Sequence, residues 1–269
     1  MDLNRYQVKT GSSPRLARCD PADKTEVPAT KRAREDASRK IGAQIDVLQN
    51  KLYAERRRSV LIVLQGMDTA GKDGTIRHVF NVVDPLGVRA VCFRAPTGAE
   101  LEHDFLWRVH AEVPRHGEIA IFNRSHYEDV LITRVHRWID KAECKRRYRV
   151  INDFEQQLAD SGTIVLKFFL NISKDEQRQR LQERIDDPNK RWKFNPQDLE
   201  ERKHWDEYQA AYEDAISATS SANAPWYVIP SNSKSTRNLL VSMILKQTLE
   251  SMNLKYPAPA QDYSKIIVN

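Results

Sequence analysis

The 269-residue chain is poor in cysteine and has no long hydrophobic run. Its three cysteines, Cys19, Cys92 and Cys144, lie far apart and form no CxxC pair, so we expect neither a disulfide framework nor a cysteine-based zinc site. No apolar segment is long enough to cross a bilayer, and the first twenty residues lack the apolar stretch of a secretory signal. These absences predict a cytoplasmic protein with reduced thiols and no membrane partner.

The sequence also lacks a strong excess of either charge, because 43 basic and 37 acidic residues leave a net charge of only +6. This excess favours an anionic partner but does not by itself predict nucleic-acid binding. The seven histidines show no HExxH or other metal-ligating spacing. A hydrophobic fraction of 40% is enough for the core of one large domain, which we predict to span residues 1–269.

Five short apolar segments alternate with helical patterns along the chain. They cover residues 59–65, 88–93, 118–123, 163–170 and 226–230. Such strands, buried on both faces and separated by helices, predict an α/β fold with a doubly wound parallel sheet, whose active edge is the carboxyl end of the strands. Residues 1–58 are expected to form an irregular arm, followed by a helix with Ile41, Ile45, Leu48 and Leu52 at helical spacing.

A phosphate-binding loop follows the first strand. The sequence GMDTAGKDGT, from Gly66 to Thr75, matches G-x-x-x-x-G-K and lies between that strand and a helix predicted to reach Val83. Lys72 adds a full positive charge to the phosphate nest, which an ordinary glycine-rich turn does not need. The other residues expected to surround phosphate in this loop are Gly66, Ala70, Gly71, Asp73, Gly74 and Thr75.

The loop departs from the common pattern at Asp73, where a Ser or Thr usually helps to hold magnesium. Asp68 is a carboxylate expected to face the bound phosphates, from which it would be repelled unless a cation lay between them. Asp68 is therefore the predicted metal ligand, for Mg²⁺ or alternatively Mn²⁺, and is counted with Lys72 among the catalytic residues. The alternative role for Asp68 is a turn aspartate that accepts hydrogen bonds from backbone amides.

The third strand ends in the sequence FNRSHYEDV, where a P-loop enzyme places its second set of active-site residues. Arg124 is predicted to be catalytic, because it could neutralise charge on the transferred group. The residues predicted to contact a nucleotide here are Asn123, Arg124, Tyr127, Glu128 and Asp129. For Glu128 and Asp129, favourable placement in the first turn of a helix is the open alternative.

Residues 173–215 read as two helices that meet at a basic turn, which predicts a lid. Ser173 with Glu176 forms a capping box for the first helix, and Asn195 before Pro196 marks the start of the second. The basic side chains of this region are Arg178, Arg180, Arg184, Lys190, Arg191 and Lys193, interleaved with Trp192 and Phe194. We expect Arg184, Lys190 and Lys193 to contact phosphate, whereas a plain solvated helix face is the alternative.

The three motifs together resemble the family-2 polyphosphate kinases. The resemblance covers residues 5 to 250 and implies a P-loop kinase-like sheet with a helical lid. It implies Mg²⁺-dependent, reversible transfer between polyphosphate and nucleotides by a homodimer or homotetramer. The positions that match functional positions of that family are Asp68, Lys72, Asn123, Arg124 and Arg184.

The segment NRSHYED is similar to the class III subgroup, which acts on both AMP and ADP. The resemblance therefore implies AMP, ADP and ATP as partners, leaves guanine nucleotides open, and makes Glu128 the residue expected to permit AMP use. Two other readings remain open. One is a nucleoside or nucleotide kinase with ATP as donor, and the other is a module that binds a nucleic-acid backbone through the same basic residues.

Overall fold

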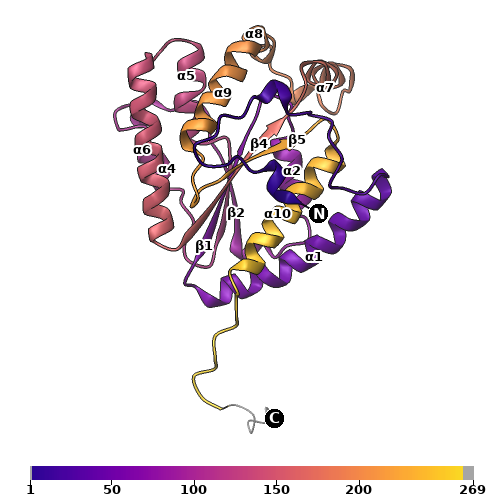
Figure 1. Ribbon diagram of the computed structural model, residues 1–269, viewed down its shortest axis with the longest axis vertical. Helices are drawn as coiled ribbons and strands as arrows, with labels where there is room; N and C mark the ends of the chain where they lie inside the picture. Colours follow the sequence, from indigo (N-terminus) through magenta and orange to yellow (C-terminus); the bar gives the residue numbers. More distant parts are fainter. Residues whose placement is uncertain (1, 263–269) are drawn as a thin grey trace.

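A five-stranded parallel sheet forms the centre of the molecule, in a computed structural model that describes residues 2–262 (Figure 1). Met1 and residues 263–269, part of the domain predicted for 1–269, lie outside this range. The strands are β1 (Ser59–Gln65), β2 (Val88–Cys92), β3 (Ile119–Asn123), β4 (Thr163–Asn171) and β5 (Trp226–Pro230). Their order across the sheet is β2-β3-β1-β4-β5, so the predicted doubly wound fold is confirmed.

Helices cover both faces of the sheet (Figure 1). One face carries α1 (Lys31–Glu55), α2 (Lys72–Val79) and α10 (Lys234–Ser251), and the other carries α6 (Lys141–Asp160) and α9 (Trp205–Thr219). The short helices are α3 (Gly98–Leu101), α4 (Trp107–His110) and α5 (Ile132–Val135). Among residues 2–262, no helix is long and apolar enough to cross a membrane.

The strand bounds agree with the sequence prediction to within one residue, because every residue of β1 and β3 is buried between the helical layers. The helix after the phosphate loop is shorter than predicted, ending at Val79 rather than Val83. Asp84 instead caps a 3₁₀ turn, η3 (Pro85–Gly87), with its carboxylate accepting from the Leu86 amide at 2.9 Å. The chain leaves helical geometry at Phe80, whose φ and ψ are −108° and 11°, and the Val83 amide donates to the Phe80 carbonyl at 3.3 Å in a turn. Asp84 does not resume the helix, because a residue before proline avoids helical geometry.

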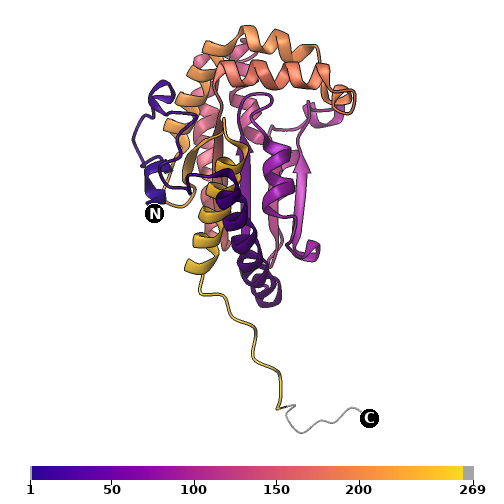
Figure 2. The ribbon, with the colours of Figure 1, turned by 90° about the vertical axis from the view of Figure 1, so that its right-hand side faces the viewer.

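The lid lies across the carboxyl ends of the strands, as Figure 2 shows. Its helices are α7 (Lys174–Asp186) and α8 (Gln197–Lys203). Ser173 caps α7 by accepting from the Glu176 amide at 3.2 Å, but the Glu176 carboxylate binds Arg180 instead of completing the capping box. Much of α9 belongs to the core, since Tyr212 and Ile216 are buried, so the predicted lid region 173–215 extends into the body of the domain.

The N-terminal arm packs along the edge strand β5. Val8 donates its backbone N–H to the Trp226 carbonyl at 2.8 Å, and Gln7 pairs with Tyr227 in an antiparallel bridge. The arm side chains that are buried against the core are Leu3, Tyr6, Val8, Leu16 and Val27. The arm is therefore irregular but firmly held.

Candidate active site

The phosphate loop has the backbone shape that its sequence predicts. Gly66 and Gly71 have φ values of +149° and +106°, and Thr69 also adopts a positive φ of +64°. Lys72 begins α2, is 9% exposed, and donates from Nζ to the Gly66 carbonyl at 2.6 Å. Burial and Arg124 lower the pKa of Lys72, whereas nearby carboxylates oppose that shift. The ammonium group thus lies at the mouth of the loop, among groups of both signs.

Asp68 and Arg124 face each other across the site. Arg124 donates from Nη2 to Asp68 Oδ1 at 2.9 Å, and it has a φ of +60° directly after β3. Burial would lower the pKa of Arg124, but Glu128 and Asp68 outweigh burial and raise it. Strained backbone at the end of a strand is a frequent feature of functional sites, and here it turns Arg124 toward the loop.

Asn123 and Asp73 form a second link between β3 and the loop. Asn123 Nδ2 donates to Asp73 Oδ1 at 2.7 Å. Asp73 is the position at which the loop departs from the common pattern, and the structure joins it to the end of β3 by this hydrogen bond. The charged groups that act on Lys72 are Arg124, Asp68, Glu128 and Asp73. The structure therefore brings together six of the predicted residues: Asp68, Lys72, Asp73, Asn123, Arg124 and Glu128.

Two buried arginines donate hydrogen bonds to backbone carbonyls of the loop. Arg180 of α7 donates to the carbonyls of Thr69 at 3.0 Å and Ser231 at 2.7 Å, so its guanidinium is structural and does not belong to the exposed basic face of the lid. Arg237 of α10 donates to the Ala70 carbonyl at 3.0 Å. Burial, with a smaller effect from Arg180, lowers the pKa of Arg237, although a guanidinium stays protonated at neutral pH. Sequence reasoning missed Arg237, because the helix start SKSTRNLL carries no phosphate-binding signature.

The lid places Arg184 and Asp198 opposite the loop. Arg184 Nη1 lies 3.3 Å from Asp198 Oδ2 and also donates to the Lys193 carbonyl at 3.3 Å. Burial and Asp68 raise the pKa of Asp198 to about 6, while Arg184, Arg124 and Lys72 act in the opposite direction. Asp198, which sequence reasoning did not single out, therefore lies within electrostatic reach of the loop.

The other predicted lid cations are directed elsewhere. Lys190 is exposed and pairs with Asp187 at 3.0 Å. Lys193 lies over the exposed Trp192 ring, with Nζ 4.9 Å from its centroid. The structure thus does not bring Lys190 or Lys193 together with the loop residues.

Tyr127 and Asp129 also face away from the loop. Tyr127 is fully buried, and its hydroxyl donates to Glu155 at 2.8 Å, a placement that argues against the predicted contact with a nucleotide. Burial raises the pKa of Asp129 to about 6, while Arg108 and Arg147 oppose the shift. Asp129 Oδ1 lies 3.8 Å from Arg147 Nη1, so the carboxylate faces α6.

Two tyrosines of α9 form a wall of the site that sequence reasoning missed. Burial raises the pKa of Tyr212 well above its usual value, with smaller contributions from Glu128 and Asp68. Tyr208 donates to Glu201 at 2.7 Å and also lies within electrostatic range of Glu128. Their i, i+4 spacing in WDEYQAAY was the available signal.

The donor atoms suit a hard cation that also binds phosphate. Among residues 2–262, no group of three or more His, Cys, Asp or Glu side chains could hold a metal ion. Asp68 instead offers one carboxylate beside a phosphate loop, with Oδ1 held by Arg124. Mg²⁺ commonly takes one or two carboxylates and completes its shell with waters and substrate phosphates, so these residues fit it.

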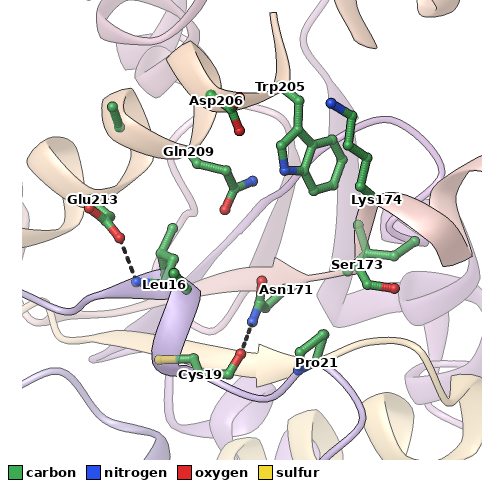
Figure 3. Close-up of a pocket in the computed structure, with 13 residues that line it drawn as sticks. Leu16, Cys19, Pro21, Asn171, Ser173, Lys174, Trp205, Asp206, Gln209 and Glu213 are labelled. Carbon is green, nitrogen blue, oxygen red and sulfur yellow. Dashed lines mark hydrogen bonds between the residues drawn. The ribbon is translucent and has the colours of Figure 1, made fainter. Parts of the chain in front are cut away.

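A cavity of about 390 Å³ lies at the base of the lid rather than at the loop (Figure 3). The arm borders it on one side, where the Leu16 amide donates to Glu213 and the Cys19 carbonyl accepts from Asn171. Trp205 of α9 and Lys174 of α7 border the other side (Figure 3). The arm thus lies beside the first residues of α7 and beside α9.

A G-x-x-x-x-G-K loop under a basic lid, at the carboxyl edge of a doubly wound parallel sheet, defines a P-loop phosphotransferase. Residues 29–257 match the sequence profile of polyphosphate kinase 2. The chain belongs to this family.

Individual relatives cover nearly the whole chain. The AMP/ADP-polyphosphate phosphotransferase of Meiothermus ruber is 53% identical over 266 residues, which is 99% of this chain and 100% of the relative. The ADP-polyphosphate phosphotransferase of Rhodopseudomonas palustris is 47% identical, over 78% of this chain and 77% of the relative. The crystal structure of polyphosphate kinase 2 from Arthrobacter aurescens superposes with a TM-score of 0.93 at 44% identity, covering 97% of this chain and 93% of the other.

Proposed function

We propose that this enzyme transfers the terminal phosphoryl group of inorganic polyphosphate, reversibly and with Mg²⁺, to AMP and to ADP. The observation that carries the proposal is the Asp68–Arg124 pair beside Lys72, with Arg184 and Asp198 of the lid opposite. The name of the M. ruber relative, which gives AMP, ADP and polyphosphate as its substrates, supports it. Polyphosphate is a long polyanion, and the space between the loop and the lid suits such a donor.

Lys72 and the loop amides would bind the terminal phosphate of the donor, and Asn123 and Arg124 would lie on the acceptor side. The bond between the terminal phosphorus and the bridging oxygen of the polyphosphate chain breaks, and a bond from that phosphorus to a phosphate oxygen of the nucleotide forms. Polyphosphate leaves one unit shorter. Because the acceptor oxygen is already anionic, no general base is needed, and positioning with charge neutralisation supplies the catalysis.

Asp68 would hold the cation, Mg²⁺ or Mn²⁺, whose chemistry when bound is to neutralise charge on the phosphates. Arg124 fixes one carboxylate oxygen of Asp68 at 2.9 Å, so it both orients that ligand and offers charge to the transferred group. Arg184 would contact the donor when the lid closes, and Lys190 and Lys193 would attract the polyphosphate chain further along the lid.

Product analysis with AMP and ADP supplied separately, each with polyphosphate and Mg²⁺, tests the proposal. ADP and ATP should form from AMP, and ATP from ADP. Lys72→Met should abolish the activity, whereas the matched control Lys246→Met, which removes a lysine paired with Glu250 on α10, should not. A wild-type enzyme that forms no nucleotide product would end the proposal.

The rival readings give different results in the same experiments. Phosphorylation by ATP of a nucleoside, without any response to polyphosphate, would point to an ATP-dependent nucleoside kinase. Salt-sensitive DNA binding that survives Lys72→Ala would point to a nucleic-acid module. Assembly as a homodimer or homotetramer, use of guanine nucleotides and a cytoplasmic location remain predictions, of which light scattering and acceptor competition would test the first two.

A further inference from the structure

Gln65 is a buried amide at the end of an apolar strand. It is the last residue of β1, directly before the phosphate loop, and its side chain is 0% exposed. The preceding strand residues from Val60 to Leu64 are apolar and equally buried. Burying an amide in such surroundings is unfavourable unless its hydrogen bonds are satisfied, so the partners of Gln65 indicate its role.

Those partners all belong to the turn after β3. Only one orientation of the amide satisfies its neighbours, and in it Nε2 donates to Glu128 Oε1 at 3.0 Å. The amide oxygen then accepts from both Oγ and the backbone N–H of Ser125 at 3.2 Å. Ser125 Oγ in turn accepts from the Tyr127 amide at 3.1 Å, which starts the 3₁₀ turn η4 (His126–Val130) that carries Glu128.

The other interactions of the Glu128 side chain are electrostatic and act over longer distances. It lies within electrostatic range of Lys72, Arg124 and the phenols of Tyr208 and Tyr212. Within residues 2–262, its carboxylate receives no other hydrogen bond than that from Gln65. Gln65 therefore fixes the direction in which the carboxylate points.

We propose that Gln65 is a positioning residue that determines acceptor selectivity by holding Glu128, an inference that rests on the proposed function. AMP and ADP differ in length by one phosphate. If the reacting phosphate of each occupies the same place, the ribose and base of the two nucleotides lie at different distances from it. A carboxylate held in one position can favour the shorter acceptor, whereas a free one adapts to both.

The decisive measurement compares kcat/KM for AMP and for ADP at saturating polyphosphate in Gln65→Leu. Because a hydrogen bond to a charged group is lost, kcat/KM for AMP should fall roughly 10- to 100-fold, and that for ADP by less than about threefold. The loss should appear mainly in KM for AMP, since a merely structural defect would lower kcat for both acceptors.

Gln49→Leu is the matched control, because Gln49 is an equally buried glutamine on α1, packed against Gly87. It makes the same chemical change and should leave the AMP to ADP ratio unaltered. A double-mutant cycle gives the second reading. If Gln65 acts through Glu128, then Gln65→Leu should change selectivity little further in a Glu128→Ala background.

Equal losses on both acceptors, additive effects in the cycle, or the same shift in Gln49→Leu would each overturn the proposal. Should Gln65→Leu fail to fold, Gln65→Glu tests it instead, since a carboxylate of the same length can still accept from Ser125 but places no N–H donor beside Glu128. Failure of the proposed function would look different, because the wild-type enzyme would then form no nucleotide product from polyphosphate. That result would overturn this inference as well.

Discussion

Replacing Gly71 by alanine tests how the phosphate loop is held. Gly71 has a φ of +106°, a backbone conformation that residues other than glycine rarely adopt. An added Cβ would overlap the Arg237 guanidinium, with Cζ only 2.7 Å away. Because Arg237 is buried and donates to the Ala70 carbonyl, it cannot move aside without losing that bond.

The expected cost of Gly71→Ala has two parts. A non-glycine residue in the left-handed region costs roughly 1–3 kcal/mol. Displacing Arg237 removes its 3.0 Å hydrogen bond to the Ala70 carbonyl and leaves only the longer one, 3.3 Å, from Arg180. Losing a hydrogen bond from a charged donor costs about 1–3 kcal/mol more. The total of roughly 2–6 kcal/mol is a large part of a typical stability of about 5–15 kcal/mol and should lower Tm by roughly 5–20 °C.

Two further glycines separate the contributions. Gly11 has a φ of +74° but open space around it, so Gly11→Ala carries backbone strain without overlap. Gly74 has an ordinary φ, and a Cβ added there would lie 3.2 Å from Arg237 Nη2, so Gly74→Ala carries mild crowding without backbone strain. Thermal unfolding followed by circular dichroism, with phosphotransfer rates at saturating substrates, should rank Gly71→Ala as the most damaging of the three.

A Gly71→Ala enzyme with a Tm within about 2 °C of wild type would refute this account of the loop. So would a loss equal to that of Gly11→Ala, because overlap with Arg237 would then contribute nothing. The double variant Gly71→Ala with Arg237→Ser adds a check, since shortening Arg237 should make the alanine less harmful if the overlap is real.

Three more predictions follow from the buried and charged groups. Asp68→Asn should lower Mg²⁺-dependent turnover roughly 100-fold or more, measured over a range of Mg²⁺ concentrations, and near-normal rates would remove Asp68 from the metal site. In the wild type, Lys167 Nζ lies 2.5 Å from Glu155 Oε2. Lys167→Met leaves the Glu155 carboxylate buried without this ammonium partner and should lower the free energy of unfolding, measured in urea, by about 3–5 kcal/mol. Changing both partners to apolar residues should cost less, and an equal cost would contradict the pairing. Burial lowers the pKa of His126, with Lys167 acting in the same direction and Glu155 against it. The native ring therefore stays neutral while the unfolded chain takes up a proton below about pH 6.5, so stability should fall as pH drops from about 7.5 to 5.5. His126→Phe should weaken that fall, and an unchanged pH dependence would exclude His126 as a cause.

The sheet was predictable because its strands are buried on both faces and therefore read as continuous apolar runs. The pattern failed where local chemistry overrides periodicity. The apolar residues after Val79 continue a helical pattern, but the Asp84–Pro85 pair forms its own capped turn. Part of α9 read as lid, yet Tyr212 packs into the core.

At the site, the loop and strand motifs placed Asp68, Lys72, Asn123 and Arg124 correctly at one edge, since parallel strands bring their carboxyl ends together. Other roles depend on tertiary contacts that have no local signature. Arg180 looks like one cation in a solvated run, but its side chain is only 6% exposed and donates to loop carbonyls.

The bridge between Gln7 and Tyr227 has a consequence for solubility. Strand β5 is an edge of the sheet, and an edge with free amides and carbonyls can pair with the edge of another molecule. The arm occupies part of that edge, with the Val8 amide already bound to the Trp226 carbonyl. Removing the first ten residues would uncover this edge, so a truncated enzyme should aggregate more readily during expression even where its active site stays intact.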